Sequence, residues 1–199
     1  MLLSFEKTKQ ILNRHNIPFL KSEIVENKKQ LKLILKKIGF PVFLKTLGLH
    51  KTEKGLVLKA ENKKQALKGF LRLKKSGIVL VQKEVKGLEL FLGAKRDKAF
   101  GIVLMFGLGG VLVEVLEDIS FGIYPLNKKE ALEMLKALKG FELLKGFRGM
   151  EKVNLNKLAK ALINLGNLVS ENPFIKEVDF NPVMAKGDDI LVIDPKIIT

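Results

Sequence analysis

Apolar residues recur at helical spacing in several segments of this sequence, and each segment begins with a residue that can cap a helix. Ser4 and Asn27 can each accept a hydrogen bond from a backbone N–H of the following first turn. Gly39 is suited to ending the second helix, because glycine adopts the left-handed conformation at little cost. The pattern predicts helices at about 5–16, 28–38, 63–75, 127–138 and 154–171.

Short apolar runs between these segments predict strands, since they are bounded by Gly, Pro, Asn or Asp. The predicted strands are 17–25, 42–47, 56–59, 79–82, 89–93, 102–106, 111–116, 178–185 and 190–193. Helices and strands alternate irregularly, and the last two strands form a hairpin. This order predicts an α+β fold with two lobes.

The composition favours a globular protein that stays in the cytoplasm. With 199 residues, of which 47% are hydrophobic, the chain can bury a proper core. No apolar run approaches the roughly 18 residues of a membrane span. The first residues lack the pattern of a signal peptide. Cysteine is absent, which excludes disulfides, thiolate metal sites and a cysteine nucleophile.

The formal charge of +15 raises the question of nucleic-acid binding. Lysine supplies 32 of the 36 basic residues, and the lysines stand singly or in pairs along the whole chain. Readout of bases and phosphates favours arginine and exposed aromatic side chains, but the chain has four arginines, one Tyr and no Trp. The lysines therefore indicate solvated helix surfaces, and no nucleic-acid partner is expected.

The final hairpin brings two oxygen-bearing side chains together. A two-residue type II′ turn beginning at Gly187 places Asn181 opposite Asp194, on the face of Val183 and Val192. Opposed Cβ atoms lie about 4.5–5.5 Å apart. Two oxygen ligands at that spacing can share one Mg²⁺, which takes one or two carboxylates together with phosphate oxygens. A hydrogen-bonded Asn–Asp pair without a metal is the alternative, and both interpretations stay open.

A glycine-rich segment, Gly107-Leu108-Gly109-Gly110, lies between two predicted strands. A Rossmann fingerprint or a P-loop would lie between a strand and a helix, so the segment is neither. Its backbone N–H groups can enclose an anion, or the segment can be a plain hairpin turn.

Three further residues could carry chemistry, each with a structural alternative. Glu114 interrupts an apolar strand, where a carboxylate must be paired, hydrogen-bonded or metal-bound. Lys45 could bind phosphates from a short strand or simply face solvent. His50 stands in a loop and could act as a base, a metal ligand or a phosphoryl acceptor, or be inert.

In their order, these segments resemble the beta subunit, or ATP-grasp module, of ADP-forming acyl-CoA synthetases of the acetyl-CoA synthetase type, relatives of succinyl-CoA synthetase. The resemblance covers essentially the whole chain. Its most specific stretches are residues 79–82, 100–110, 113–121, 143–149 and 177–182.

The resemblance implies a single ATP-grasp domain over 1–199, with an N-terminal helical segment at 1–18, a small lobe at 19–85 and a large lobe at 86–199. It implies that Lys45 binds nucleotide phosphates and that Glu89 is an acidic residue of the nucleotide pocket. It also implies that the segment from Gln82 to Val85 meets the adenine edge.

The resemblance further implies a catalytic role for His50, Mg²⁺ ligation by Asn181 and Asp194, and nucleotide contacts from Gly107, Gly109 and Gly110. Glu114 is expected to be catalytic because it stands only four residues after the glycine segment. The cofactor is then Mg²⁺, and ATP or ADP is a substrate. A CoA-binding alpha subunit would be the partner in a hetero-oligomer, with a phosphoryl group passing from a partner histidine to His50 and on to ADP.

The chain departs from the family pattern in two places. Gly122 stands where the family usually has an arginine, and the interval between Lys45 and His50 is shorter than usual. Two alternatives follow, another ATP-grasp carboxylate ligase or a non-catalytic nucleotide-binding subunit.

Overall fold

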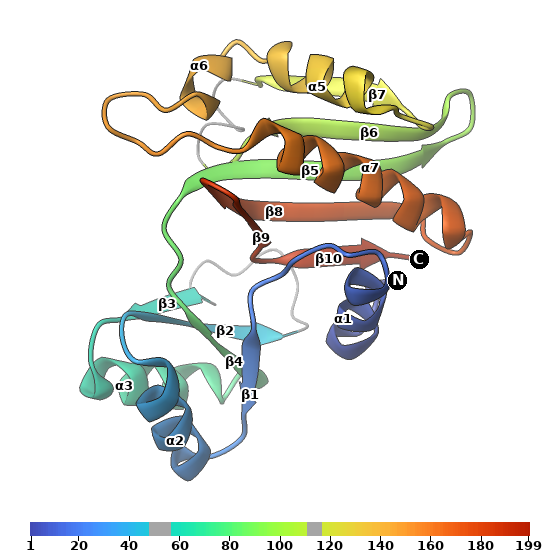
Figure 1. Ribbon diagram of the computed structural model, residues 1–199. Coiled ribbons are helices and arrows are strands. Elements are labelled where there is room, and N and C mark those ends of the chain that lie inside the picture. Colours follow the sequence, from blue (N-terminus) through green and yellow to red (C-terminus); the bar gives the residue numbers. More distant parts are fainter. Residues whose placement is uncertain (48–56, 111–116) are drawn as a thin grey trace. The chain divides into compact units, whose positions relative to one another are not determined.

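The chain is divided into two compact units, which Figure 1 shows as ribbons. The computed structural model describes residues 1–47, 57–110 and 117–199. The large unit comprises residues 1–19 together with 86–199, and the small unit comprises Leu20–Val85. The N-terminal helix therefore belongs to the large unit, although it lies far in sequence from the rest of it.

The small unit is a four-stranded antiparallel sheet with two helices on one face. The strands are β1 (Ser22–Val25), β2 (Val42–Leu47), β3 (Val57–Ala60) and β4 (Ile78–Lys83), in the order β1-β4-β2-β3. The helices are α2 (Lys28–Ile38) and α3 (Lys63–Leu73). Their apolar faces meet the sheet in a core that includes Leu31, Leu35 and Phe70.

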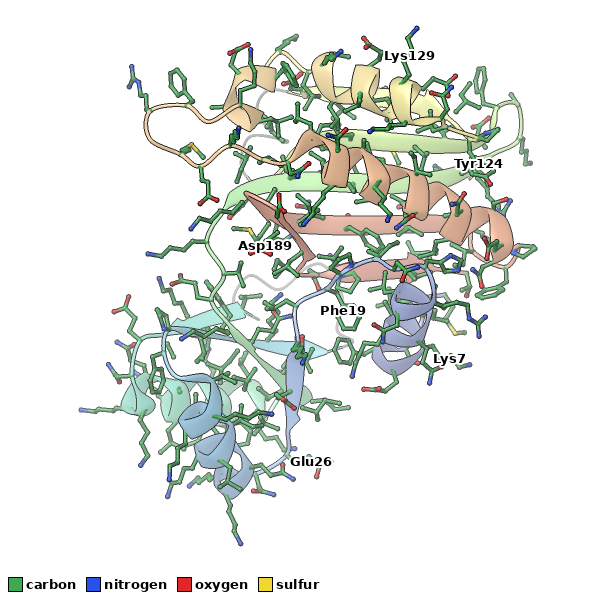
Figure 2. All side chains as sticks on the ribbon, in the orientation of Figure 1. Lys7, Phe19, Glu26, Tyr124, Lys129 and Asp189 are labelled. Carbon is green, nitrogen blue, oxygen red and sulfur yellow. The ribbon has the colours of Figure 1, made fainter. Side chains whose placement is uncertain are left out.

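The same five residues, Glu-Asn-Lys-Lys-Gln, lead into each helix of the small unit, and the helix starts at the first Lys. Asn27 and Asn62 each accept a hydrogen bond of 3.0 Å from the N–H three residues later. These caps confirm the predicted helix starts. Long side chains that end in nitrogen extend away from both helices, as Figure 2 shows.

The large unit is built on a six-stranded antiparallel sheet. Its strands are β5 (Leu88–Asp97), β6 (Gly101–Leu108), β7 (Ile119–Ile123), β8 (Glu177–Lys186), β9 (Asp189–Val192) and β10 (Pro195–Ile198). The order is β10-β8-β5-β6-β7, and β9 pairs with the other end of β8.

The helices of the large unit are α1 (Phe5–Arg14), α5 (Lys128–Lys136), the short α6 (Phe141–Leu144) and the long α7 (Leu155–Glu171). α5 and α7 lie side by side across one face of the sheet (Figure 1). Leucines of α7 and alternate residues of the strands are buried together there, among them Leu162, Leu104 and Phe180. The residues between them on the same strands, such as Glu89 and Phe121, face the other way and are exposed.

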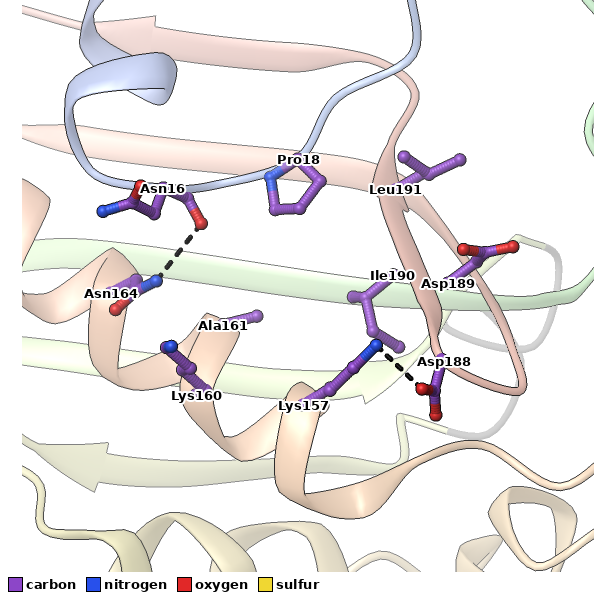
Figure 3. Close-up of a pocket in the computed structure, with 10 residues that line it drawn as sticks. All are labelled: Asn16, Pro18, Lys157, Lys160, Ala161, Asn164, Asp188, Asp189, Ile190 and Leu191. Atoms are coloured by element: carbon purple, nitrogen blue, oxygen red, sulfur yellow. Dashed lines mark hydrogen bonds and ion pairs between the residues drawn. The ribbon is translucent and has the colours of Figure 1, made fainter.

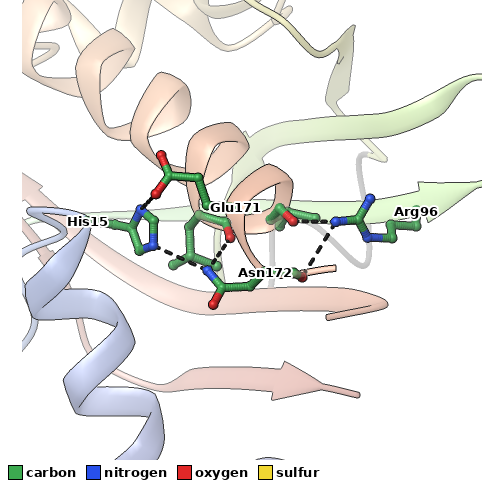
Figure 4. A network of polar contacts seen from close by, with 6 residues as sticks. His15, Arg96, Glu171 and Asn172 are labelled. Atoms are coloured by element: carbon green, nitrogen blue, oxygen red, sulfur yellow. Dashed lines mark hydrogen bonds and ion pairs between the residues drawn. The ribbon is translucent and has the colours of Figure 1, made fainter. Parts of the chain in front are cut away.

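A network of polar contacts holds α1 against the end of α7 (Figure 4). Asn172 donates through Nδ2 to the Leu168 carbonyl at 2.7 Å and lies 3.2 Å from His15 Nε2. Arg96 donates through Nε to the Ile175 carbonyl at 2.9 Å and through Nη2 to the Val169 carbonyl. The guanidinium thus gives the Val169 carbonyl, near the end of the helix, a second donor besides the Asn172 N–H, and it gives the Ile175 carbonyl beyond the helix a donor.

Several predicted boundaries were wrong. The strand predicted at 17–25 is regular only over β1, because Ile17 is buried in the core of the large unit. β7, β10 and α6 were not predicted, since each is short and lacks a clear period. In the described residues, no helix is both long enough and apolar enough to cross a membrane.

Candidate functional site

The hairpin of β8 and β9 has the predicted register. Lys186 pairs with Asp189 across the turn and Val183 pairs with Val192, while Gly187 adopts a φ of +55°. Beyond the end of β9, Phe180 pairs with Pro195 in the same register. The register is therefore continuous on both sides of Asn181 and Asp194, which places these two residues opposite each other.

A β-bulge changes the face to which Asn181 belongs. In the pairing of β5 with β8, Asn181 and Pro182 together oppose the single residue Phe91. Phe180 is buried on one side of this bulge and Val183 on the other, so the alternation of side chains reverses. Asn181 thus lies with Phe91 on the partly exposed face. Its predicted position on the face of Val183 was wrong, because strict alternation does not allow for a bulge.

Asp194 shares a lysine with a second carboxylate. Lys196 Nζ lies 3.2 Å from Asp194 Oδ2 and 4.0 Å from Asp179 Oδ2. The side chains of Asp194 and Asp179 are 42% and 25% exposed, so solvent reaches both. Asp179 and Lys196 were not among the predicted site residues. Each is two residues from a predicted ligand on the same face, so the predicted register was enough to find them.

The side chains at this place fit a hard cation that also binds phosphate. An amide oxygen from Asn181 and a carboxylate from Asp194 are ligands that Mg²⁺ accepts, and Mg²⁺ usually keeps further positions for water and phosphate. Among the described residues, no group of three or more His, Cys, Asp or Glu side chains is placed to hold a metal. The pair therefore suits a metal that arrives with a nucleotide better than a closed structural site.

Glu89 and the glycine segment, predicted separately, lie together. The N–H of Gly109 donates to the Glu89 carbonyl at 2.6 Å. A Cβ at Gly109 would lie 2.8 Å from backbone atoms of Glu89 and Leu90, and a Cβ at Gly110 would overlap with the Glu89 carboxylate. Gly110 also has a φ of +64°, which favours glycine. The glycines are therefore needed for the backbone to approach Glu89.

The glycine segment is only partly a loop. Gly107 lies within β6, paired with Phe91 of β5 and Ile119 of β7. The predicted strand end at residue 106 was thus too early by two residues. The N–H of Gly109 is used by the backbone, so in this conformation it does not face an anion. An anion-binding role of the remaining segment stays a prediction.

Lys45 lies on β2, in the interior of the sheet of the small unit. It pairs with Val57 of β3 and with Leu80 of β4. Its neighbour Leu44 is fully buried in the helix-covered core, so Lys45 projects from the opposite face of the sheet. A lysine in this position can reach a ligand on that face, which suits the predicted phosphate contact.

Gln82 and Val85 lie at the end of β4. Gln82 is only 3% exposed, and its Nε2 donates to Ser22 Oγ at 2.7 Å. Next to Val85, the Glu84 carboxylate lies 2.7 Å from Lys59 Nζ. This hydrogen bond raises the pKa of Lys59 above its usual value. The segment after β4 is thus fixed by polar contacts, which suits a backbone that recognises a ligand edge.

His50 and Glu114 lie outside the described residues. Their roles as phosphoryl acceptor and buried carboxylate therefore stay predictions.

A pocket with a volume of about 400 Å³ lies beside α7 and the tip of the β8–β9 hairpin (Figure 3). At its edge, Asp188 accepts from Lys157 Nζ at 2.9 Å and from Asn154 Nδ2 at 2.8 Å. The hydrogen bond from Lys157, followed by that from Asn154, lowers the pKa of Asp188. None of the predicted site residues is among those that line this pocket.

Comparisons with known proteins concern the family and the fold of the whole chain. The model of the family described as "ATP-grasp domain" matches residues 1–199. The chain is 32% identical to the beta subunit of acetate–CoA ligase (ADP-forming) I from Pyrococcus furiosus, over 96% of this chain and 89% of that subunit. It is 35% identical to acetate–CoA ligase (ADP-forming) II from Archaeoglobus fulgidus, where the match covers all of this chain but only 30% of the longer relative.

The fold is similar to a solved structure of dinucleotide-forming acetyl-coenzyme A synthetase 1 from Candidatus Korarchaeum cryptofilum in complex with coenzyme A, Ca-AMPCP and HgCl⁺. The TM-score is 0.88 at 34% identity, covering 100% of this chain and 92% of that one. A second structure of the same protein contains coenzyme A and Mg-AMPPCP, with a phosphohistidine segment pointing towards the nucleotide-binding site. It has a TM-score of 0.85 at 36% identity, over 99% of this chain and 92% of that one.

Proposed function

The chain belongs to the ATP-grasp family, and we propose that it is the nucleotide-binding subunit of an ADP-forming acyl-CoA synthetase. The observation that carries this proposal is the hairpin of the large unit, where Asn181 and Asp194 stand opposite each other in continuous register. The chain is 32% identical to a protein named as a beta subunit, 89% of which it covers, and this similarity supports the existence of a partner subunit.

In this proposal the residues of the large unit hold the nucleotide and its metal. Asn181 and Asp194 would ligate Mg²⁺, which when bound neutralises phosphate charge. Lys196 Nζ, 3.2 Å from Asp194 Oδ2, offsets the negative charge of this carboxylate and holds the side chain in place. Glu89, fixed by the glycine segment, contacts the nucleotide, and Gly107, Gly109 and Gly110 allow the backbone to come close.

The small unit contributes the other predicted contacts. The ammonium group of Lys45 interacts with the nucleotide phosphates as a positive point charge. The segment from Gln82 to Val85 meets the adenine edge through its backbone. Phosphoryl transfer needs little covalent chemistry from a protein beyond such positioning and charge neutralisation.

The reaction begins on a partner. A CoA-binding subunit converts acyl-CoA and phosphate to acyl phosphate and CoA, and one of its histidines takes the phosphoryl group and releases the carboxylate. His50 then accepts the phosphoryl group as the P–N bond to the partner breaks. An oxygen of the ADP β-phosphate attacks the phosphorus, which yields ATP and free His50, and Glu114 assists as a carboxylate of the site.

The cytoplasmic location that the sequence favours stays a prediction.

The relay is tested by reconstituting the chain with its CoA-binding subunit and following labelled phosphate on each subunit. In His50→Ala, the partner should still be phosphorylated from acyl-CoA and phosphate. ATP formation should fall by more than about a hundredfold, since removal of a nucleophile is among the largest single losses. Thr52→Ala, in the same segment, serves as control. Undiminished ATP synthesis by His50→Ala would rule out the relay.

One observation keeps a non-catalytic subunit as the second candidate. The chain has Gly122 where the family usually has an arginine, and a Cβ at Gly122 would overlap with Met134 Sδ, so an arginine here would require the Met134 side chain to move. A chain that had lost turnover would bind nucleotide but make no ATP with any partner. The same reconstitution decides between the two candidates. The wild-type chain forms ATP with its partner if it is catalytic, and forms none if it is not.

A further inference from the structure

One conspicuous loop of the large unit has no part in the proposed nucleotide site. Residues 145–152 connect α6 with α7, and the side chains of the whole loop are exposed. The loop contains Phe147, which is 47% exposed, and Met150, which is 43% exposed. Between them stands Arg148, one of only four arginines in a chain with 32 lysines.

The loop is held in one conformation from its base to its tip. At the base, the Val153 N–H donates to the Leu144 carbonyl at 2.8 Å, and both residues are buried. At the tip, the Met150 N–H donates to the Phe147 carbonyl at 3.1 Å and closes a turn. Gly146 lies so close that a Cβ there would be 2.7 Å from the Met150 carbonyl oxygen.

The hairpin of the proposed metal site fixes the base of the loop from the other side. The Gly187 N–H donates to the Lys152 carbonyl at 3.1 Å, and the Asn154 N–H donates to the Gly187 carbonyl at 2.7 Å. Both hydrogen bonds join the loop to the tip of the same hairpin whose strands carry Asn181 and Asp194. The exposed tip is therefore mounted on rigid elements.

The backbone of Arg148 is strained to present its side chain. Its φ is +47°, in the left-handed region that non-glycine residues seldom occupy. The guanidinium lies 5.3 Å from the centre of the Phe147 ring. An arginine held in an unfavourable backbone conformation beside an exposed aromatic ring suggests a function, since such strain persists where the surroundings impose it.

The loop has the composition of an interface anchor. It combines an exposed aromatic side chain, an arginine and a methionine in one ordered segment. These residue types are enriched at the centres of protein interfaces, and aromatic and arginine side chains dominate the binding free energy. A single exposed apolar residue would need no explanation. Here Phe147, Arg148 and Met150 stand together, and a preordered loop loses little conformational entropy on binding.

We propose that residues 145–152, called here the docking loop, bind the CoA-binding partner subunit. This inference rests on the proposed function, which requires such a partner. The single-chain relative from Archaeoglobus fulgidus is about three times as long as the part that matches, so a covalent chain joins its ATP-grasp portion to the rest of that protein. A separate subunit lacks such a link and needs a binding surface instead.

The charge of the docking loop indicates what the partner offers. Lys145 Nζ lies 2.5 Å from Glu142 Oε1 and Lys186 Nζ lies 3.5 Å from Glu151 Oε2, so the excess positive charge of the loop comes from Arg148 and Lys152. We therefore expect the CoA-binding subunit to offer an apolar pocket for Phe147 and Met150, surrounded by carboxylates. Binding should weaken as salt rises, because screening reduces attraction between exposed charges.

The test uses the CoA-binding subunit from the same organism, purified separately. Calorimetry at two salt concentrations measures how tightly this subunit binds the chain. Phe147→Ala combined with Arg148→Glu should raise Kd by roughly thirtyfold or more, as for interface anchors. The matched controls are Phe174→Ala, which removes a ring that is 52% exposed elsewhere on the large unit, and Arg14→Glu on α1. Both should leave Kd within about threefold of the wild-type value.

A second measurement separates the possible failures. The thermal shift produced by Mg-ADP should be the same in all variants, which shows that they fold and bind nucleotide. If that shift is intact but the double variant binds the partner like wild type, the docking loop is refuted and the proposed function stands. If wild type itself gives no shift with Mg-ADP, the proposed function fails first.

Self-association is the remaining outcome. If sedimentation shows that the chain alone forms a dimer that the double variant abolishes, the occupant of the loop is a second copy of the chain and the proposal is overturned. A wild-type chain that binds Mg-ADP but has no measurable affinity for the CoA-binding subunit would also overturn it.

Discussion

The two units follow one plan, an antiparallel sheet with helices on one face, yet they carry charge very differently. The small unit has 17 Lys and Arg against 5 Asp and Glu, a net charge of +12. The rest of the chain has 19 against 16, a net charge of +3. Nearly all the excess charge of the chain therefore lies in 66 of its 199 residues.

The units also differ in how their polar groups are used. In the large unit, Arg96, Asp118 and Asn172 bind backbone groups that would otherwise lack partners. In the described part of the small unit, the lysines of α2 and α3 enter one ion pair, between Lys37 and Glu23 at 3.6 Å. The comparison teaches that the charges of the large unit are nearly balanced, whereas the helices of the small unit hold to their apolar core despite a large excess of positive charge.

The largest effect is expected from opening either core. Phe180→Ala in the large unit and Phe70→Ala in the small unit should each cost about 3–5 kcal/mol of the free energy of unfolding, because both rings are buried. Hydrogen exchange should show lost protection chiefly in the unit that carries the substitution. Phe100→Ala, at a ring that is 63% exposed, is the control. Equal loss in both units would mean that they unfold as one.

The polar network of the large unit should account for the next effect. Arg96→Ala removes the donor to the Ile175 carbonyl and one of the two donors to the Val169 carbonyl, and should cost about 1.5–3 kcal/mol. Chemical denaturation measures the loss. Arg72→Ala, an exposed position on α3 of the small unit, should change stability by less than about 0.5 kcal/mol. Similar losses at both positions would refute the contrast between the units.

Charge substitutions should have opposite signs in the two units. Lys32→Glu on α2 creates pairs with Lys28 and Lys36, four residues away on either side, and should add about 0.2–0.5 kcal/mol for each pair. Lys157→Glu in the large unit sets a carboxylate beside Asp188 and should destabilise it. Thermal melting at low and high salt measures both. Stabilisation by both substitutions would mean that net charge alone decides.

The smallest effect concerns the pH dependence of the hairpin tip. The hydrogen bond from Lys157 lowers the pKa of Asp188 in the folded state, so its stabilising contribution is present above the ordinary carboxyl pKa. It is lost as the pH falls through the lower folded-state pKa. NMR titration of Lys157→Ala should show Asp188 titrating closer to its ordinary range. Asp97, whose pKa is lowered by the N–H groups of Ala99 and Phe100, should not change.

Features set by local chemistry were predictable from the sequence. Ser4, Asn27 and Asn62 cap helices as expected, because a short polar side chain reaches a free N–H of the first turn. The register of the final hairpin followed from the positive φ that Gly187 can adopt. Both depend on neighbours within a few residues.

Features set by distant pairing were not predictable in the same way. The bulge at Asn181 arises from pairing with β5, some ninety positions earlier in the sequence. The contact of Glu89 with Gly109 and Gly110 requires the pairing of β5 with β6. The roles of Lys45 and His50 came from the family resemblance, because an isolated lysine or histidine carries too little information in its local sequence.

The most direct test of the central claim, that this chain binds nucleotide through the Asn181–Asp194 pair, is titration calorimetry of ADP with and without Mg²⁺. Wild type should bind ADP more tightly with Mg²⁺, and Asp194→Asn should abolish that gain while leaving the metal-free affinity largely unchanged. Asp189→Asn, an exposed carboxylate on the same hairpin, should behave like wild type. Absence of ADP binding by wild type, or an undiminished Mg²⁺ effect in Asp194→Asn, would contradict the claim.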